Sequence, residues 1–97
     1  MVKMNENNAY KRGQELLDSG MYKEAVAQFD IVLREQPDSW KAMNSRGFAF
    51  QKMSKYTEAV ECFDKALAIN PKSVEVLNNK EVLSIANAVS KQAIASL

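Results

Sequence analysis

The side chains that most often perform catalysis are nearly absent from this sequence of 97 residues. It contains no histidine, and Cys62 is its only cysteine. This composition excludes Ser–His and Cys–His nucleophile pairs, disulfides within the chain and zinc sites built from cysteine and histidine. No group of cations surrounds Cys62 in the sequence, so we predict an inert, half-buried thiol.

Carboxylates and glycines are present, but their spacing matches no known site. The acidic residues do not form an EF-hand loop, and Gly13, Gly20 and Gly47 stand alone instead of forming a phosphate-binding loop. We therefore predict that the protein is not an enzyme and that it holds neither a cofactor nor a metal.

The charge is balanced, with 13 basic and 12 acidic residues and a formal net charge of +1. This balance does not favour a nucleic-acid partner. No stretch approaches the roughly 20 apolar residues that span a membrane, and the first residues lack the apolar run of a secretory signal. We expect a cytoplasmic protein with no nucleic-acid or membrane partner, forming a single domain over residues 1–97.

An internal repeat is the strongest organising feature of the sequence. A shift of 34 residues places Gly13 on Gly47 and Tyr22 on Tyr56, and it gives eleven identities between residues 9 and 39. Chance would give about two identities over this length.

The pattern within each repeat predicts two helices. Ser39 and Ser73 are expected N-caps, Gly20 is expected to end a helix, and Pro37 and Pro71 lie beyond the second helix of each unit. Apolar residues recur at helical spacing and no segment alternates as a strand would. We expect an all-α protein with helices near 5–18, 22–35, 39–53, 56–69 and 74–95. Gly13 and Gly47 fall inside helices, which suggests close packing at these points.

The repeated residues resemble the tetratricopeptide-repeat family. The resemblance is carried by a glycine, a tyrosine, an alanine, a phenylalanine and a proline at matching places in both units: Gly13, Tyr22, Ala25, Phe29 and Pro37, then Gly47, Tyr56, Ala59, Phe63 and Pro71. It implies an α-α superhelix, a solenoid of stacked helical hairpins whose first helices line a concave groove. Such a groove implies a scaffold or adaptor that binds a peptide or helix of another protein.

The third unit departs from this pattern. Glu81 stands where Gly13 and Gly47 stand in the earlier units, and no second helix of the repeat type follows. We predict two full repeats, about 6–39 and 40–73, followed by one capping helix of about 74–95.

The resemblance also implies which side chains would face a partner. The nine groove positions expected to bind, from the first, third and fifth helices, are Tyr10, Gln14, Leu17, Lys41, Asn44, Phe48, Gln51, Asn78 and Val82. The same surface also includes Asn7, Asp18, Lys52, Glu75 and Ile85. Some of these residues have an equally good explanation that involves no partner. Phe48 could instead fill space between helices, and the asparagines could lie on helix faces exposed to solvent. Trp40 is expected to pack.

One subgroup of the family binds the carboxyl-terminal carboxylates of heat-shock proteins with a clamp of cationic and asparagine side chains. The matching positions here are Tyr10, Gln14, Ser45, Glu75 and Asn79. None is a cation and Glu75 would repel a carboxylate, so we predict that this clamp is absent.

Self-association is the alternative to peptide binding. Two repeats are fewer than the three or so that stabilise an array, so the groove or the C-terminal helix could bury surface against a second copy. An excised part of a longer repeat array is a further possibility.

Overall fold

The computed structural model describes residues 6–95, with side chains described for 8–92, and this part of the chain contains five helices and no strand. The helices are α1 (Glu6–Asp18), α2 (Tyr22–Glu35), α3 (Trp40–Lys52), α4 (Tyr56–Ile69) and α5 (Val74–Ala95). The predicted all-α class and the five predicted helices are confirmed, and the bounds differ by at most one residue. Residue 5, the predicted start of the first helix, lies outside the described residues.

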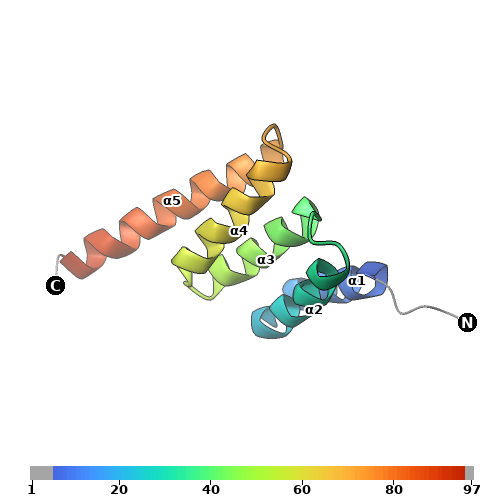
Figure 1. The fold of residues 1–97 in the computed structure, drawn as a ribbon. Coiled ribbons are helices and arrows are strands. Elements are labelled where there is room, and N and C mark those ends of the chain that lie inside the picture. Colours follow the sequence, from blue (N-terminus) through green and yellow to red (C-terminus); the bar gives the residue numbers. More distant parts are fainter. Residues whose placement is uncertain (1–5, 96–97) are drawn as a thin grey trace, which may run out of the picture.

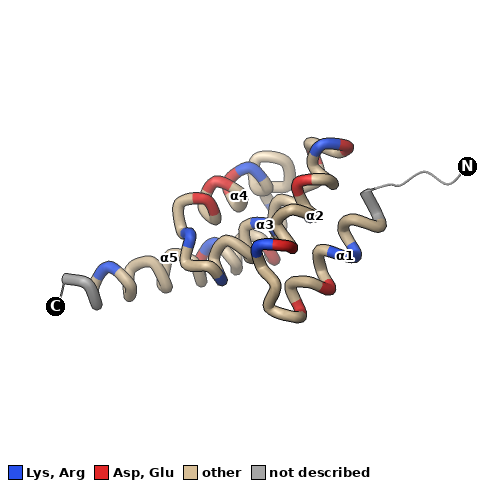
Figure 2. Tube along the Cα trace, turned by 90° about the horizontal axis from the view of Figure 1, so that it is seen from below, with Lys and Arg blue, Asp and Glu red and all other residues tan. Residues whose placement is uncertain are grey.

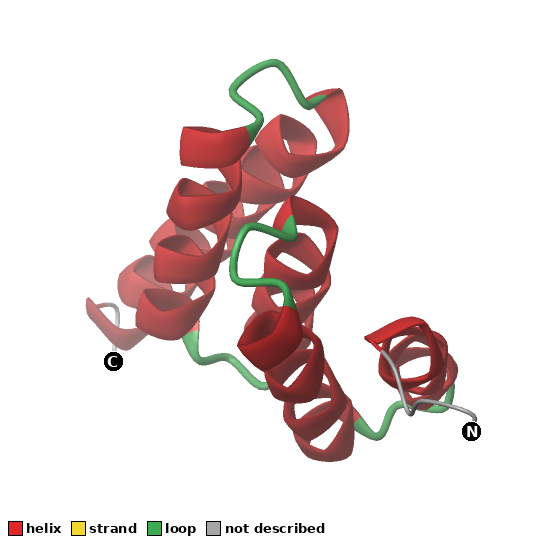
Figure 3. Ribbon diagram, turned by 45° about the vertical axis from the view of Figure 1, so that its right-hand side comes forward, coloured by secondary structure: helices red, strands yellow, loops and turns green. Residues whose placement is uncertain are grey.

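Two helical hairpins and one long helix follow one another in space as they do in sequence. Hairpin α1–α2 packs through α2 against α3, and α4 of the second hairpin packs against α5 (Figure 1). The short connections reverse the chain direction between successive helices (Figure 3). The C-terminal part of α5 extends beyond the ends of α3 and α4, and no described side chain of α5 after Leu83 is buried.

The predicted caps form at the start of α3 and α5. The hydroxyl of Ser39 accepts a hydrogen bond from the Ala42 N–H, and the hydroxyl of Ser73 accepts one from the Val76 N–H, each at 3.3 Å. Each serine thus satisfies one of the N–H groups that a helix start leaves without a partner.

Each first helix ends in a turn with one left-handed residue. In the first hairpin this residue is Gly20, at a φ of 77°, and in the second it is Ser54, at a φ of 61°. In both turns the next N–H bonds back five residues, from Met21 to the carbonyl of Leu16 and from Lys55 to that of Phe50. The prediction that Gly20 ends a helix is confirmed.

The two helices of each hairpin meet at the predicted glycines. A Cβ added to Gly13 would lie 2.6 Å from Phe29 Cε1, and a Cβ added to Gly47 would lie 2.7 Å from Phe63 Cε1. Both phenylalanines are fully buried. The close approach inferred from the sequence is therefore an approach of an aromatic ring to the helix backbone.

The core has two parts that correspond to the two interfaces between units. The first joins α1 and α2 to the start of α3: Ala9, Ala25, Phe29, Val32 and Ala42. The second joins α4 to α5: Ala59, Phe63, Ala66, Val76 and Leu83. Burial of Val76 and Leu83 fixes which side of α5 faces the protein.

An ion pair recurs at both interfaces with the repeat spacing. Arg46 Nε lies 2.7 Å from Asp30 Oδ1, and Lys80 Nζ lies 2.7 Å from Asp64 Oδ1. Each pair joins the second helix of one unit to the first helix of the next.

Candidate functional site

A cavity of about 280 Å³ opens among the first helices of the three units. We call it the α1–α3–α5 groove. Its lining residues come from α1, from α3 and from the first turns of α5: Gln14, Leu17, Asp18, Asn44, Ser45, Phe48, Glu75 and Asn79.

Three polar side chains form a hydrogen-bonded network in this groove. Asn44 is 3% exposed, and its Nδ2 donates to Glu75 Oε1 at 3.1 Å. Asn79 Nδ2 donates to Asn44 Oδ1 at 2.9 Å. The amide of Asn44 thus has a partner for both its donor and its acceptor side, as a buried polar group requires. The network links α3 to α5 across the groove.

Four of the nine predicted groove residues line the cavity: Gln14, Leu17, Asn44 and Phe48. Of these, Asn44 is buried and already paired, so its role here is to position Glu75 and Asn79. Gln14, Leu17 and Phe48 are half-buried and remain open to a ligand.

The other five predicted residues lie outside the cavity lining. Tyr10 packs edge-on against Phe29 with ring centroids 5.9 Å apart and holds Gln14 through its hydroxyl. Lys41 lies beside the Trp40 ring, and Gln51 is half-buried with its Oε1 unpaired. Asn78 and Val82 are exposed on α5.

Four further residues line the groove: Asp18, Ser45, Glu75 and Asn79. Asp18 and Glu75 belong to the wider groove surface that the family resemblance implied, whereas Ser45 and Asn79 were not among its groove positions. Both of these occupy positions that match the carboxylate clamp, so the clamp register is the signal that could have found them. The side chain of Asn7, at the same predicted surface, lies outside the described residues. Asn79 lines the groove while its neighbour Asn78 faces solvent, because one residue turns a helix by about 100°.

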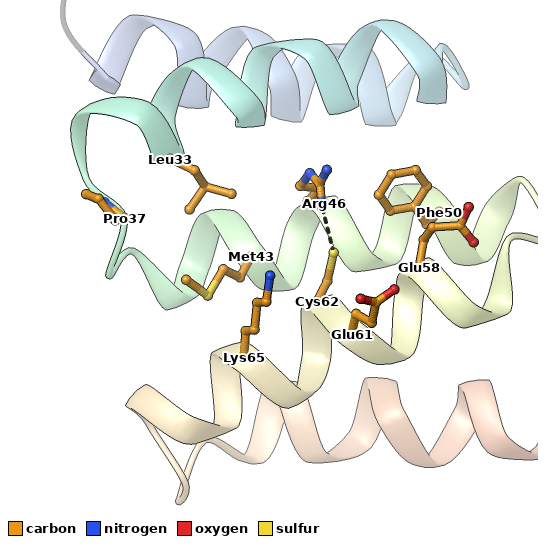
Figure 4. Close-up of a pocket in the computed structure, with 9 residues that line it drawn as sticks. All are labelled: Leu33, Pro37, Met43, Arg46, Phe50, Glu58, Glu61, Cys62 and Lys65. Atoms are coloured by element: carbon orange, nitrogen blue, oxygen red, sulfur yellow. Dashed lines mark hydrogen bonds between the residues drawn. The ribbon is translucent and has the colours of Figure 1, made fainter.

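A larger cavity of about 480 Å³ lies elsewhere, between the second helices of the two hairpins and α3. Leu33, Pro37 and Met43 line one end, and Phe50 and Glu58 line the other (Figure 4). Glu61, Cys62 and Lys65 also contribute from α4, and Arg46 lies between the two ends.

Arg46 connects this cavity to the ion pair with Asp30. Its Nη1 donates to Cys62 Sγ at 3.1 Å, and its guanidinium carbon lies 4.9 Å from the centroid of the Phe50 ring. Burial opposes the charge on Arg46, but the hydrogen bonds to Asp30 and Cys62 raise its pKa above the usual value.

Cys62 is more buried than the sequence suggested, at 3% exposure. Burial raises the pKa of its thiol, and the hydrogen bond from Arg46 opposes that shift only in part. A raised pKa keeps the thiol protonated near neutral pH, which is the less reactive form. The predicted inertness is consistent with this environment.

Charges of both signs are interspersed along the helices (Figure 2). Among the residues that the structure describes, no group of three or more histidine, cysteine, aspartate or glutamate side chains is placed to hold a metal ion. Within the same residues, no helix combines the length and the apolar character needed to cross a bilayer.

Comparison with known proteins identifies the repeat. The sequence model of the tetratricopeptide repeat matches residues 40–73. Human superkiller complex protein 3 is 34% identical over 64 residues, which cover 66% of this chain and 4% of that protein. The chain thus spans a small fraction of the length of this relative.

A solved structure has the same fold. It is the first tetratricopeptide-repeat domain of Spaghetti (RPAP3), bound to the HSP90 peptide SRMEEVD. The TM-score is 0.82 at 21% sequence identity, over 87% of this chain and 67% of the other.

Proposed function

We propose that this chain, which belongs to the tetratricopeptide-repeat family, is a scaffold or adaptor that binds a peptide segment of a partner protein in the α1–α3–α5 groove. The observation that carries the proposal is the cavity of about 280 Å³ lined by the first helices of three successive units. The similar fold of a domain bound to a peptide supports it.

The groove has the mixture of side chains that peptide recognition requires. Leu17 and Phe48 offer half-buried apolar surface for an anchor side chain, and Gln14 and Asn79 offer amides to the peptide backbone. The Asn44 network holds α5 in place, so this wall of the groove is formed before a ligand arrives.

A displayed peptide library selected on the immobilised chain tests this function. We expect peptides whose binding is weakened about five- to thirtyfold by Phe48→Ala or Leu17→Ala, since each removes apolar contact worth roughly 1–2 kcal/mol. Leu33→Ala is the matched control, because Leu33 is also half-buried but lines the other cavity. Peptides that bind equally to all variants with preserved helicity would contradict the assignment of the groove.

The same groove argues against binding of acidic carboxyl-terminal tails. The solved neighbour binds SRMEEVD, whereas this groove is lined by two carboxylates and no Lys or Arg. We therefore expect SRMEEVD to bind no tighter than about 1 mM. A submillimolar Kd in a fluorescence titration would overturn this part of the proposal.

Self-association through α5 is the second candidate function. Five apolar residues on α5 are 46–68% exposed: Val74, Leu77, Val82, Ile85 and Val89. Their spacing places them on one side of the helix, opposite the buried Val76 and Leu83.

Sedimentation at several concentrations tests the second candidate. A dimer formed through α5 should dissociate when Ile85→Lys places a charge in its centre. Ser84→Lys is the control, since Ser84 is exposed on the same helix and outside the apolar set. A protein that stays monomeric at millimolar concentration removes this candidate.

A further inference from the structure

The charge of the groove lining is one-sided although the charge of the whole chain is balanced. Among the eight lining residues, Asp18 and Glu75 are carboxylates and none is Lys or Arg. The two acids come from the end of α1 and the start of α5, so they reach the same cavity from different helices. Both side chains are exposed.

Glu75 is held in a defined position by its neighbours. Asn44 donates to its Oε1, and Asn44 is itself buried and held by Asn79. Glu75 is nevertheless exposed and lines the cavity. Its carboxylate is therefore anchored by the protein and accessible to a ligand.

Two lysines of α3, neither of which lines the cavity, lie against aromatic rings. Lys52 Nζ lies 5.3 Å from the centroid of the Phe48 ring, and Lys41 Nζ lies 5.9 Å from the centroid of the Trp40 ring. Lys52 therefore contacts Phe48, which lines the cavity, but Lys52 itself is not part of the lining. The charged residues of the lining are both acidic.

We propose that the groove binds its partner through a cationic side chain, an arginine, placed between Asp18 and Glu75. This inference rests on the proposed peptide-binding function and specifies the class of peptide. The planar guanidinium has five N–H donors, which two carboxylates can share, and its apolar stem fits against Leu17. An acidic ligand side chain would be repelled from the same place.

Two small probes isolate the contribution of charge. N-acetylarginine amide and N-acetylcitrulline amide have nearly the same shape, but only the first is cationic. Binding is followed by NMR through the side-chain amides of Gln14 and Asn79, which line the groove. We expect the arginine probe to bind about fivefold tighter than the citrulline probe. This ratio of dissociation constants corresponds to a partly exposed charge pair worth about 1 kcal/mol.

Conservative variants connect the effect to the two carboxylates. Glu75→Gln keeps an oxygen that accepts from Asn44, and Asp18→Asn keeps the shape of that side chain. Each should reduce the preference for the arginine probe about twofold or more, and both together should abolish it. Lys52→Gln is the control and should leave the preference unchanged or increase it. Equal binding of the two probes to the unmodified protein, or a preference that survives the double variant, overturns the inference.

The outcome is distinguishable from failure of the proposed function. If library peptides depend on Phe48 but the two probes bind equally, the arginine inference is overturned and the peptide-binding function stands. If the arginine probe is preferred through Glu75 while no peptide depends on Phe48 or Leu17, the cationic subsite is supported and the peptide function is overturned.

Discussion

The ring of Phe29 occupies the space that a side chain on Gly13 would need, since a Cβ there would lie 2.6 Å from Cε1 of the ring. The same relationship joins Gly47 to Phe63, at 2.7 Å. Both rings are fully buried in the core, so neither can turn away into solvent. The absence of a side chain at these two glycines is thus a condition for closing each hairpin.

Gly13→Ala and Gly47→Ala should each lower the free energy of unfolding by about 1–3 kcal/mol, the range for an overpacked core. This loss is expected although alanine is favoured over glycine in helices by about 1 kcal/mol. Urea denaturation measures the change, and Glu15→Ala, at an exposed position of α1, serves as the control. A raised midpoint for either glycine variant would show that the rings move aside easily.

The two left-handed turns allow a reciprocal exchange. Ser54 adopts a φ of 61° where the first hairpin has Gly20, at 77°. A residue with a Cβ costs roughly 1–2 kcal/mol in this conformation, whereas glycine adopts it freely. Ser54→Gly should therefore raise the free energy of unfolding by about 1 kcal/mol, and Gly20→Ser should lower it by about the same amount. The thermal midpoint should move in the same direction in each case. Thermal unfolding of both variants checks the sign, and changes in the same direction would contradict it.

Asn44 should contribute more to stability than its position in a groove suggests. Asn44→Ala removes two hydrogen bonds and leaves Glu75 and Asn79 without their partner, so we expect a loss of about 1–3 kcal/mol. Asn78→Ala is the matched control, because Asn78 occupies the equivalent position 34 residues later but is exposed. This substitution should change stability little. Equal midpoints for the two variants in urea would mean that the network does not hold α5.

The repeated ion pair should be unequal in strength at its two positions. Lys80 pairs with Asp64 at the surface, so Lys80→Ala should cost less than about 1 kcal/mol and less still in 1 M salt. Arg46 also bonds Cys62 and contacts the Phe50 ring, so Arg46→Ala should cost about 1–2 kcal/mol and depend less on salt. Denaturation at low and high salt compares them, and identical losses would refute the difference.

Cys62 should react slowly in the native protein. Burial raises the pKa of its thiol above the usual 9.0, despite the opposing hydrogen bond from Arg46. Alkylation by iodoacetamide near pH 8 should be at least about tenfold slower in buffer than in urea. The folded state binds this proton more tightly than the unfolded state does. The thiol's contribution to stability is therefore fully present below the ordinary pKa of 9.0 and is lost as the pH rises through the higher pKa of the folded state. Equal alkylation rates would mean that the thiol is accessible.

The helices were predictable because local signals and the repeat agree. The spacing of Gly13 with Gly47, and the caps at Ser39 and Ser73, identify the same bounds from two independent patterns. The ion pair of Arg46 with Asp30 was not predicted, although 34 residues further on the chain again has a basic and an acidic residue, Lys80 in α5 and Asp64 in α4. Sequence spacing alone does not show which side chains meet across a helix interface.

The groove was predicted less completely than the helices. Among the predicted positions, Gln14, Leu17 and Phe48 line the cavity. Asn44, however, is buried and bonded to Glu75 and Asn79 of α5, and Asn79 lines the groove in place of Asn78. Such details depend on how one helix is rotated against another, which side-chain packing determines and residue spacing does not.

The packing of each helix mainly on its neighbours in the sequence also governs how the chain folds. Few distant segments must meet, so contact order is low and we expect folding within microseconds to milliseconds. Either hairpin can nucleate and the rest can add to it in sequence. The central α3 has partners on most sides and should exchange its amide hydrogens last, while the projecting end of α5 should exchange them first.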